Sequence, residues 1–272
     1  MIAFNPERDR MRHILDLDRY PIDRLGTLAG DDLVTACQAE LARDGMFNLP
    51  GFVRPEMIQL AAEQLKPLIE TVAFTHRRSH NVYFRREVPG LSPGHPALRT
   101  FDTISQTLCG DQVAATLIGR IYDWTPLADF LAAVMEKPKL YLMEDPLARV
   151  NVMGYRDGEA LNWHFDRSQF TTTLLIQEPR SGGEFQYRTD LRSDDDPNYD
   201  GVVKFIDGLD PLVRTLPQRA GTLNVFKGKN TVHRVTPVEG DRDRIVAVFS
   251  YYERPGVLFS AEERIGFYGR PG

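Results

Sequence analysis

Apolar residues in the first part of the chain recur at the spacing of a helix. In 31–43 they lie three or four positions apart, which is typical of a helix with one buried face. The next apolar run, 46–53, contains a Pro-Gly pair and predicts a strand followed by a turn. The helical spacing returns in 55–72 and in 102–137, so this part of the chain is predicted to be mostly helical.

The segment 75–100 breaks this pattern. It is rich in cations at 76–78 and 85–86, and proline and glycine interrupt it at 89–96. Long irregular loops inside a compact domain are usually functional or disordered. Two interpretations stay open, a solvated surface loop or a flap that brings arginines to an anionic group of a ligand.

From residue 140 the pattern changes to short apolar or β-branched runs, separated by glycine, aspartate and proline. Short strands at such spacing are typical of an all-β sandwich or barrel. We therefore expect a helical N-terminal part packed around a C-terminal β core, without two independent domains. The acidic run 194–200 is expected to be a loop tip. The predicted strands are 140–143, 148–154, 160–165, 171–177, 184–188, 213–216, 222–227, 231–236 and 244–252.

Composition narrows the class of protein. Of the 272 residues, 42% are hydrophobic and 26% are charged, which is ordinary for a globular protein and excludes collagen-like and disordered chains. A formal net charge of −5 disfavours nucleic acid and anionic membranes as partners. A small-molecule partner is expected instead, and a homodimer stays open. No run of about 18 apolar residues occurs, so no membrane span is expected.

The cysteines and the first residues bear on location. Cys37 and Cys109 are too few for a disulfide framework and are expected to be reduced. The stretch 1–8 lacks the apolar segment of a secretory signal. Together these observations predict a cytoplasmic protein.

Two of the six histidines lie on predicted strands of the β core. His164 and Asp166 are two residues apart, and side chains at that spacing on a strand point to the same face. One imidazole beside one carboxylate provides two ligands of a 2-His-1-carboxylate metal site. His233, on a later predicted strand, is the candidate for the third.

Arg244 is the second feature of interest. It follows His233 by eleven residues and opens the apolar strand 244–252. A buried arginine needs a partner, because an unpaired buried charge is very costly. A small dicarboxylate bound to the metal would pair with the guanidinium through two hydrogen bonds.

This set of residues resembles that of the iron(II)/2-oxoglutarate dioxygenases. The resemblance implies a mainly β fold, a double-stranded β-helix (a jelly-roll or cupin-like core) flanked by helices. It implies one dioxygenase domain over 1–272, with a mostly helical supporting segment 1–139, the core 140–256 and a tail 257–272. It also implies that His164, Asp166 and His233 bind iron(II), and that Arg244 binds the distal carboxylate of 2-oxoglutarate.

The same resemblance suggests further contacts to 2-oxoglutarate. The stretch 151–158 looks like the strand and turn that precede the His-x-Asp strand in many of these enzymes. Asn151 and Tyr155 are the candidates there, and Ser250 matches a hydroxyl residue found a few positions after the arginine. The alternative for Asn151 and Tyr155 is an ordinary turn or core polar residue.

A closer resemblance runs from about residue 95 to the C-terminus. The strings 164–170, 173–177, 182–185, 233–240 and 267–270 look like those of radical halogenases and hydroxylases of free amino acids, of which the lysine enzymes are known examples. In the halogenases of that group, glycine stands at the carboxylate position and leaves room for chloride on iron. Asp166 fills that position here, so the resemblance implies hydroxylation, with O₂ consumed and 2-oxoglutarate converted to succinate.

The substrate-binding residues of that group match this sequence less completely than the metal ligands do. In the lysine enzymes an acidic residue, which meets the substrate amine, follows the His-x-Gly or His-x-Asp element, whereas this chain has Arg167. An acidic, neutral or N-acylated substrate is therefore expected, within the broader class of free or N-modified amino acids. For each further candidate, a surface salt bridge or core packing is the alternative. Those candidates are Arg99 and Ser250 for a carboxylate, Trp163 for the pocket wall, and Glu144 or Asp145 for an amine.

Three other functions stay open. A nucleotide or another small metabolite could be the substrate of the same reaction. A metal enzyme without 2-oxoglutarate could use the same barrel, and so could a non-catalytic cupin-like binding or sensor protein. Arg244 distinguishes a 2-oxoglutarate enzyme from a metal enzyme without 2-oxoglutarate, because only the former requires this arginine.

Overall fold

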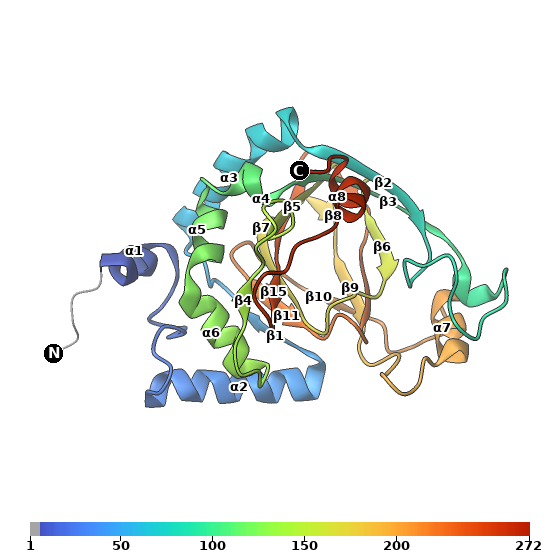
Figure 1. Ribbon diagram of the computed structural model, residues 1–272, viewed down its shortest axis with the longest axis horizontal. Coiled ribbons are helices and arrows are strands. Elements are labelled where there is room, and N and C mark those ends of the chain that lie inside the picture. The colour runs from blue at the N-terminus through green and yellow to red at the C-terminus, as the bar shows by residue number, and fades with distance from the viewer. Residues whose placement is uncertain (1–5) are drawn as a thin grey trace.

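An antiparallel sheet of seven strands forms the largest part of the fold (Figure 1). The structure is a computed structural model that describes residues 6–272. The expectation about a secretory signal therefore falls mostly on residues 1–5, outside the described residues. In spatial order the strands are β1 (Met46–Leu49), β11 (Leu223–Phe226), β7 (Thr171–Gln177), β14 (Arg244–Phe249), β5 (Val150–Tyr155), β3 (Phe101–Leu108) and β2 (Phe74–His80).

A second, smaller sheet provides the other wall of the β core, and the two sheets together confirm the predicted jelly-roll double-stranded β-helix. Four strands make this sheet: β10 (Arg214–Leu216), β9 (Phe185–Arg188), β12 (Val232–Val235) and β6 (Leu161–His164). Two short pairs complete the strands: β13 (Val238–Glu239) with β8 (Ser181–Gly182), and β15 (Tyr251–Tyr252) with β4 (Tyr141–Leu142).

Helices cover the outer face of the larger sheet. Figure 1 shows α2, α3, α5 and α6 on one side of the strands, and α7 on the opposite side. Fully buried side chains such as Phe47, Leu65 and Phe130 fill the layer between helices and sheet. The helices are α1 (Pro6–Ile14), α2 (Leu28–Asp44), α3 (Pro55–Thr71), α4 (Gly110–Val113), α5 (Leu117–Asp123), α6 (Thr125–Val134), α7 (Tyr199–Ile206) and α8 (Ala261–Tyr268), with one 3₁₀ turn, η1 (Pro96–Leu98).

Local sequence sets the limits of the two long helices. The Thr27 hydroxyl accepts a hydrogen bond from the Gly30 N–H in the first turn of α2, and Gly45 ends α2 in the left-handed conformation that favours glycine. Pro55 begins α3 at a position where its missing N–H costs nothing. Across residues 6–272, no helix combines the length and apolar character that crossing a membrane requires.

Two expectations for the first half were wrong in part. The segment 75–100 was expected to be irregular and 102–137 to be helical, but 74–80 and 101–108 form the paired strands β2 and β3. The remainder of the second segment contains α4, α5 and α6, as predicted. Polar residues fill most positions of both strands, because one face of each meets a cavity rather than an apolar core. The lack of apolar alternation hid the strand pattern, and Ile104 and Leu108, four residues apart, resemble one side of a helix.

The rest of the irregular segment packs against α7 to form what we call the side lobe, residues 81–100 together with 189–213. Its small core includes Val82, Phe165 and Phe205. The chain at 194–200 was expected to be a loop tip, yet α7 begins at Tyr199. Asn198 caps this helix by accepting the Gly201 N–H, and the loop prediction is therefore correct only up to this cap.

The last residues form a helix instead of a plain tail. Ser260 and Glu263 make a reciprocal capping box at the start of α8. The fully buried carboxylate of Asp145 holds the segment by accepting hydrogen bonds from the Phe259 N–H and the Arg264 guanidinium. This anchoring places α8 against the β core.

Candidate active site

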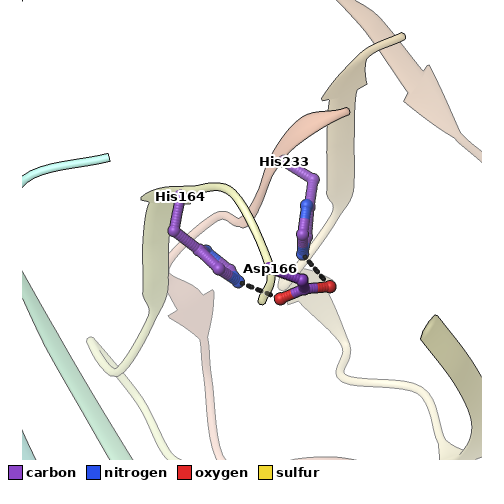
Figure 2. Close-up of side chains that lie close together, drawn as sticks. All are labelled: His164, Asp166 and His233. Atoms are coloured by element: carbon purple, nitrogen blue, oxygen red, sulfur yellow. Dashed lines mark ion pairs between the residues drawn. The ribbon is translucent and has the colours of Figure 1, made fainter. Parts of the chain in front are cut away.

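Strand pairing brings the two predicted histidines together. His233 on β12 lies directly opposite His164 on β6, and Asp166 follows just beyond the end of β6. The Nε2 atom of His164 is 3.4 Å from Asp166 Oδ1, and the Nε2 atom of His233 is 3.5 Å from Asp166 Oδ2. Figure 2 shows both imidazoles directed at the carboxylate. One ligand atom from each residue can be chosen so that all three lie within 4.8 Å of one another.

Backbone carbonyls fix the form of both imidazoles. His164 Nδ1 lies 2.8 Å from the Asn162 carbonyl oxygen, and His233 Nδ1 lies 3.0 Å from the Thr231 carbonyl oxygen. A carbonyl can only accept, so each Nδ1 carries a proton and each Nε2 lone pair is free for a metal. Burial lowers the pKa of His233 to about 4, so this imidazole is neutral at neutral pH.

The carboxylate of Asp166 is ionised and held in place. Burial opposes ionisation by raising its pKa, whereas the hydrogen bond that the Thr171 hydroxyl donates favours the ionised form and lowers that pKa. The backbone N–H of Asp166 donates to the Gly228 carbonyl oxygen at 3.1 Å. Two imidazoles and one carboxylate on one side of a cavity match the facial donor set that suits iron(II).

This cluster lies in a cavity of about 260 Å³ between the two sheets, which also contains Arg244. Arg244 stands opposite Tyr155 across the β14–β5 pair and is 3% exposed. Its Nη2 lies 3.4 Å from Gln218 Oε1, whereas its Nη1 has no hydrogen-bond partner within residues 6–272. Burial lowers the pKa of Arg244 to about 10, which leaves it charged at neutral pH.

A buried guanidinium with an unused donor is fitted to receive a carboxylate. Leaving such a donor unpaired costs free energy, and a carboxylate pairs with the planar fork of arginine in a bidentate manner. The metal cluster and Arg244 therefore match the two ends of 2-oxoglutarate. Of the other candidates for this ligand, Asn151 and Tyr155 line the same cavity, and the Tyr268 hydroxyl donates to Asn151 Oδ1 at 3.0 Å.

Ser250 does not line this cavity, contrary to expectation. Strand β14 ends at Phe249, so the alternation that would turn Ser250 inward stops one residue earlier. The Ser250 carbonyl oxygen instead accepts a hydrogen bond from the Tyr122 hydroxyl at 2.7 Å.

Arg99 and Trp163 also lie outside the cavity. Arg99 pairs with Asp207 at 2.8 Å and so joins the two parts of the side lobe. Trp163 packs edge-on against Phe205, and the Arg234 guanidinium covers its ring at 4.4 Å. Both residues are therefore engaged in packing the lobe and the smaller sheet.

Arg167, Glu144 and Asp145 form surface and structural contacts. Arg167 pairs with Glu263 at 3.4 Å, and 67% of its side chain is exposed. Glu144 accepts a hydrogen bond from the Gly256 N–H, and Asp145 anchors α8. The structure therefore brings none of the three to the cavity.

The part of the cavity that β2 and β3 provide was not predicted. Strand β2 contributes His76 and Arg78, so one arginine of the basic segment does face the cavity, but from a strand rather than a flap. The available signal was the run of polar residues along both strands, which leaves no apolar face. Also missed were Thr103, Ser105 and Thr107 of β3, together with Phe84, Phe267 and Tyr268 from other segments.

Solved structures with this fold include several oxygenases and biosynthetic enzymes. AviO1 from Streptomyces viridochromogenes Tue57 is 15% identical, with a TM-score of 0.54 over 82% of this chain and 96% of that one. HygX from Streptomyces hygroscopicus, solved with nickel and 2-oxoglutarate bound, is 13% identical, with a TM-score of 0.54 over 79% and 85%.

The epimerase SnoN from nogalamycin biosynthesis, in complex with Fe³⁺ and α-ketoglutarate, is 15% identical, with a TM-score of 0.53 over 84% of this chain and 88% of that one. At these identities the similarity establishes the fold. The search of curated proteins found no match. A family model described as halogenase D matches residues 29–257, most of the chain, and the protein therefore belongs to the halogenase D family.

Proposed function

We propose that this protein is an iron(II)- and 2-oxoglutarate-dependent oxygenase that hydroxylates an unactivated C–H bond of a small polar substrate. One observation carries the proposal: the His164, Asp166 and His233 cluster shares a cavity with Arg244, whose buried Nη1 has no partner within residues 6–272. The three ligands alone would also suit other iron enzymes. The unpaired guanidinium favours a 2-oxoglutarate enzyme over the other candidates.

The residues of the site have separate roles. When bound, iron(II) and 2-oxoglutarate supply the oxidation of a C–H bond by O₂, with succinate, CO₂ and the hydroxylated substrate as products. His164, Asp166 and His233 would hold the iron and would leave further coordination positions for the reactants. Arg244 holds the distal carboxylate of the cosubstrate, and apolar walls formed by Leu161, Val235 and Val246 keep water away from it.

Asp166 supports hydroxylation over halogenation within this family. Its carboxylate stands between the two imidazoles, and Thr171 and Gly228 surround it. A halide would need the coordination position that this carboxylate fills. We therefore assign oxygen transfer to the substrate as the reaction.

The charges in the cavity support an anionic substrate. Arg78 lines the cavity, with its guanidinium 4.8 Å from the centre of the Phe84 ring, and none of residues 6–272 forms an ion pair with it. Apart from Asp166, no carboxylate among the described residues lines the cavity. A substrate carboxylate would be paired by Arg78, whereas a free ammonium group would find no carboxylate outside the metal cluster.

Hydroxyl groups also line the part of the cavity in which we expect the substrate to bind. Thr103, Ser105 and Thr107 of β3 line the cavity next to Arg78 and can orient further polar groups. A carboxylic acid without a free amine, such as an N-acylated amino acid, satisfies these requirements. Free lysine does not, because its side-chain ammonium would lie beside cations.

The test is an assay with pooled substrates. The protein is loaded anaerobically with iron(II) and 2-oxoglutarate and mixed with pools of N-acylated amino acids, dicarboxylic acids and free amino acids. O₂ and chloride are then admitted, and succinate and product masses are followed. A burst of succinate with one added oxygen in an N-acylated or dicarboxylic acid is expected. A chlorinated product would overturn the role given to Asp166, and failure of the protein to bind 2-oxoglutarate would overturn the function.

A further inference from the structure

Phe84 has an unusual backbone conformation for a bulky residue. Its φ is 52°, in the left-handed region that favours glycine, and an aromatic residue occupies that region at a cost in free energy. Strain of this kind persists only where the surrounding structure enforces it, and it is concentrated at functional sites. Of the non-glycine residues with positive φ in 6–272, Phe84 alone lines the cavity. The strained position is thus one whose side chain reaches the site.

The Asn81 side chain enforces this conformation. Its Oδ1 accepts hydrogen bonds from the Tyr83 N–H at 3.0 Å and the Arg85 N–H at 3.3 Å, and its Nδ2 donates to the Arg85 carbonyl oxygen at 2.6 Å. The Asn81 carbonyl oxygen accepts the Phe84 N–H at 3.1 Å. Asparagine is suited to organising a turn in this way, through bonds to the backbone that follows it. We call residues 81–85 the Phe84 turn.

A backbone hydrogen bond ties the Phe84 turn to the segment that provides two of the metal ligands. The Phe165 N–H donates to the Val82 carbonyl oxygen at 2.8 Å. Phe165 stands between His164 and Asp166 in the sequence. The Phe84 ring also makes a T-shaped contact with the His164 ring, with 5.2 Å between the ring centres. The turn therefore has a fixed position relative to the metal cluster.

His80 gives the Phe84 ring a further support. The two ring centres are 4.1 Å apart, and the ring planes are inclined by 31°. His80 Nδ1 lies 2.9 Å from the Asn81 carbonyl oxygen, which can only accept, so Nδ1 carries a proton. Nε2 therefore accepts a hydrogen bond from the Thr103 hydroxyl at 2.8 Å. Burial lowers the pKa of His80 to about 4, so at neutral pH this imidazole is neutral and does not repel the Arg78 guanidinium.

Arg78 depends on the Phe84 ring for its place in the cavity. Its guanidinium carbon lies 4.8 Å from the ring centre, within the range of a cation–π contact. Within residues 6–272 the guanidinium has neither an ion pair nor a hydrogen bond. The Phe84 ring is therefore the contact that orients this cation, and it leaves the hydrogen-bond donors of Arg78 unused.

We propose that Phe84 is a positioning residue that sets where the substrate carboxylate lies relative to the metal. This inference rests on the proposed function, in which Arg78 pairs with that carboxylate. The turn fixes the ring, the ring orients the guanidinium, and the turn itself is bonded to the metal-ligand segment. The carboxylate is thereby held at a constant distance from the metal, and that distance selects the carbon that is oxidised.

The first part of the test measures binding without turnover. The protein is loaded anaerobically with 2-oxoglutarate and Co(II), which replaces iron(II), and is mixed with the pools of N-acylated amino acids and dicarboxylic acids. Ultrafiltration and mass spectrometry identify the members that are retained, and calorimetry gives the Kd of the one retained most strongly. Phe84→Leu should bind this member about 3- to 30-fold more weakly, as expected for a lost cation–π contact. Phe84→Tyr, which keeps an aromatic face, should bind it as the unaltered protein does.

The second part measures the products formed from the same pool member with iron(II) and O₂. The unaltered protein and Phe84→Tyr should place the oxygen on a single carbon. Phe84→Leu should give a mixture of positional isomers and more succinate per hydroxylated product, because a loosely held substrate presents several carbons to the metal.

Tyr83→Leu is the matched control. Its ring belongs to the same turn, but it stacks on Phe165 in the core of the side lobe and does not line the cavity. This variant should resemble the unaltered protein in Kd and in product. A second comparison uses an Arg78→Gln background, in which Phe84→Leu should cause little further loss of affinity, because residues that act through one contact are not additive.

The outcomes separate this inference from the proposed function. Unaltered protein that binds no 2-oxoglutarate, or retains no carboxylic acid of the pools, contradicts the proposed function. Unaltered protein that binds and oxidises a pool member, with Phe84→Leu giving the same Kd and the same single product, contradicts only the role of Phe84. Equal losses in Phe84→Leu and Tyr83→Leu, or additive losses with Arg78→Gln, would overturn the positioning role.

Discussion

Arg244 lies directly opposite Tyr155 across the β14–β5 pair, and its guanidinium enters the cavity with Nη1 unpaired by any of residues 6–272. The fold thus contains a buried charge whose hydrogen bonds are incomplete until a ligand arrives. An unmet buried donor lowers the free energy of unfolding. Arg244 therefore strengthens ligand binding and lowers the free energy of unfolding of the ligand-free protein.

Replacing Arg244 by methionine should separate these two effects. We expect 2-oxoglutarate to bind at least about 30-fold more weakly, because removing one partner of a buried charge pair costs about 2 kcal/mol or more. The ligand-free protein should become more stable by about 1 kcal/mol, since the unmet donor disappears. Calorimetric titration and urea unfolding measure the two quantities.

Arg234→Met is the matched control for that change. Arg234 donates twice to Gln186 and covers the Trp163 ring, so its hydrogen bonds are met within the fold. Its replacement should lower the free energy of unfolding and leave 2-oxoglutarate affinity unchanged. Equal destabilisation by Arg244→Met and Arg234→Met would show that Arg244 is satisfied without a ligand.

Arg78→Gln should affect the substrate alone. The affinity for 2-oxoglutarate and the slow formation of succinate without substrate should stay as they are. With the substrate that the pooled assay identifies, kcat/KM should fall about 10- to 100-fold, since a hydrogen bond to a charged group contributes about 1.5–3 kcal/mol. Arg99→Gln, in the side lobe, should leave kcat/KM within a few-fold, and a reversed order of the two effects would favour Arg99 as the substrate ligand.

Metal binding should stabilise the protein only when the cluster is intact. At a Co(II) concentration 100 times its Kd, linkage predicts a gain of about 2.7 kcal/mol in the free energy of unfolding. His233→Ala should abolish that gain. His76→Ala, which removes a cavity histidine outside the cluster, should retain it. Thermal unfolding with and without Co(II) and a chelator gives the comparison, and a gain that survives His233→Ala would place the metal elsewhere.

The ionisation of Asp145 should make the free energy of unfolding depend on pH in the acid range. Burial would raise its pKa, but hydrogen bonds from the Phe259 N–H, the Arg264 guanidinium and two further backbone N–H groups outweigh burial and lower it. Because the folded pKa is the lower one, the contribution is complete above the ordinary value of about 3.9 and is lost as the pH falls through the folded pKa.

Asp145→Asn should therefore lower the free energy of unfolding by about 2 kcal/mol at neutral pH, with a difference that shrinks in acid. Urea unfolding from neutral pH down to acid measures it. Glu144→Gln is the control, since that exposed neighbour accepts a single hydrogen bond from the Gly256 N–H. A deficit for Asp145→Asn that stays constant down to the most acid pH would contradict the lowered pKa.

The metal ligands could be predicted because their geometry is largely local. The two-residue spacing of His164 and Asp166 predicts a shared side, and the two side chains do meet although Asp166 lies just beyond the end of β6. His233 lies in a short segment rich in β-branched residues, and Arg244 opens a continuous apolar run, both of which are typical of strands. For these residues, knowing the strand is nearly the same as knowing the direction of the side chain.

The substrate side could not be predicted in the same way. Arg78 and Arg99 belong to one basic segment, and only the pairing of β2 with β3 turns the first toward the cavity and leaves the second in the side lobe. Strand β3 presents Thr103, Ser105 and Thr107 to the cavity, so it lacks the apolar face by which strands are usually found. The prediction that Ser250 contacts 2-oxoglutarate was wrong for a related reason, since no residue near this position signals the end of β14.

The C-terminal helix α8 contributes Phe267 and Tyr268 to the cavity wall, and polar contacts with Asp145, Asn151 and Arg167 hold it to the rest of the chain. A terminal helix opens more often than the sheets it covers, and its opening free energy rises when a ligand bridges it to the core. The amide hydrogens of α8 should therefore exchange with solvent deuterium more slowly as the cavity fills. Hydrogen exchange in α8 thus reports whether a ligand occupies the cavity, and it can be measured before any substrate is identified.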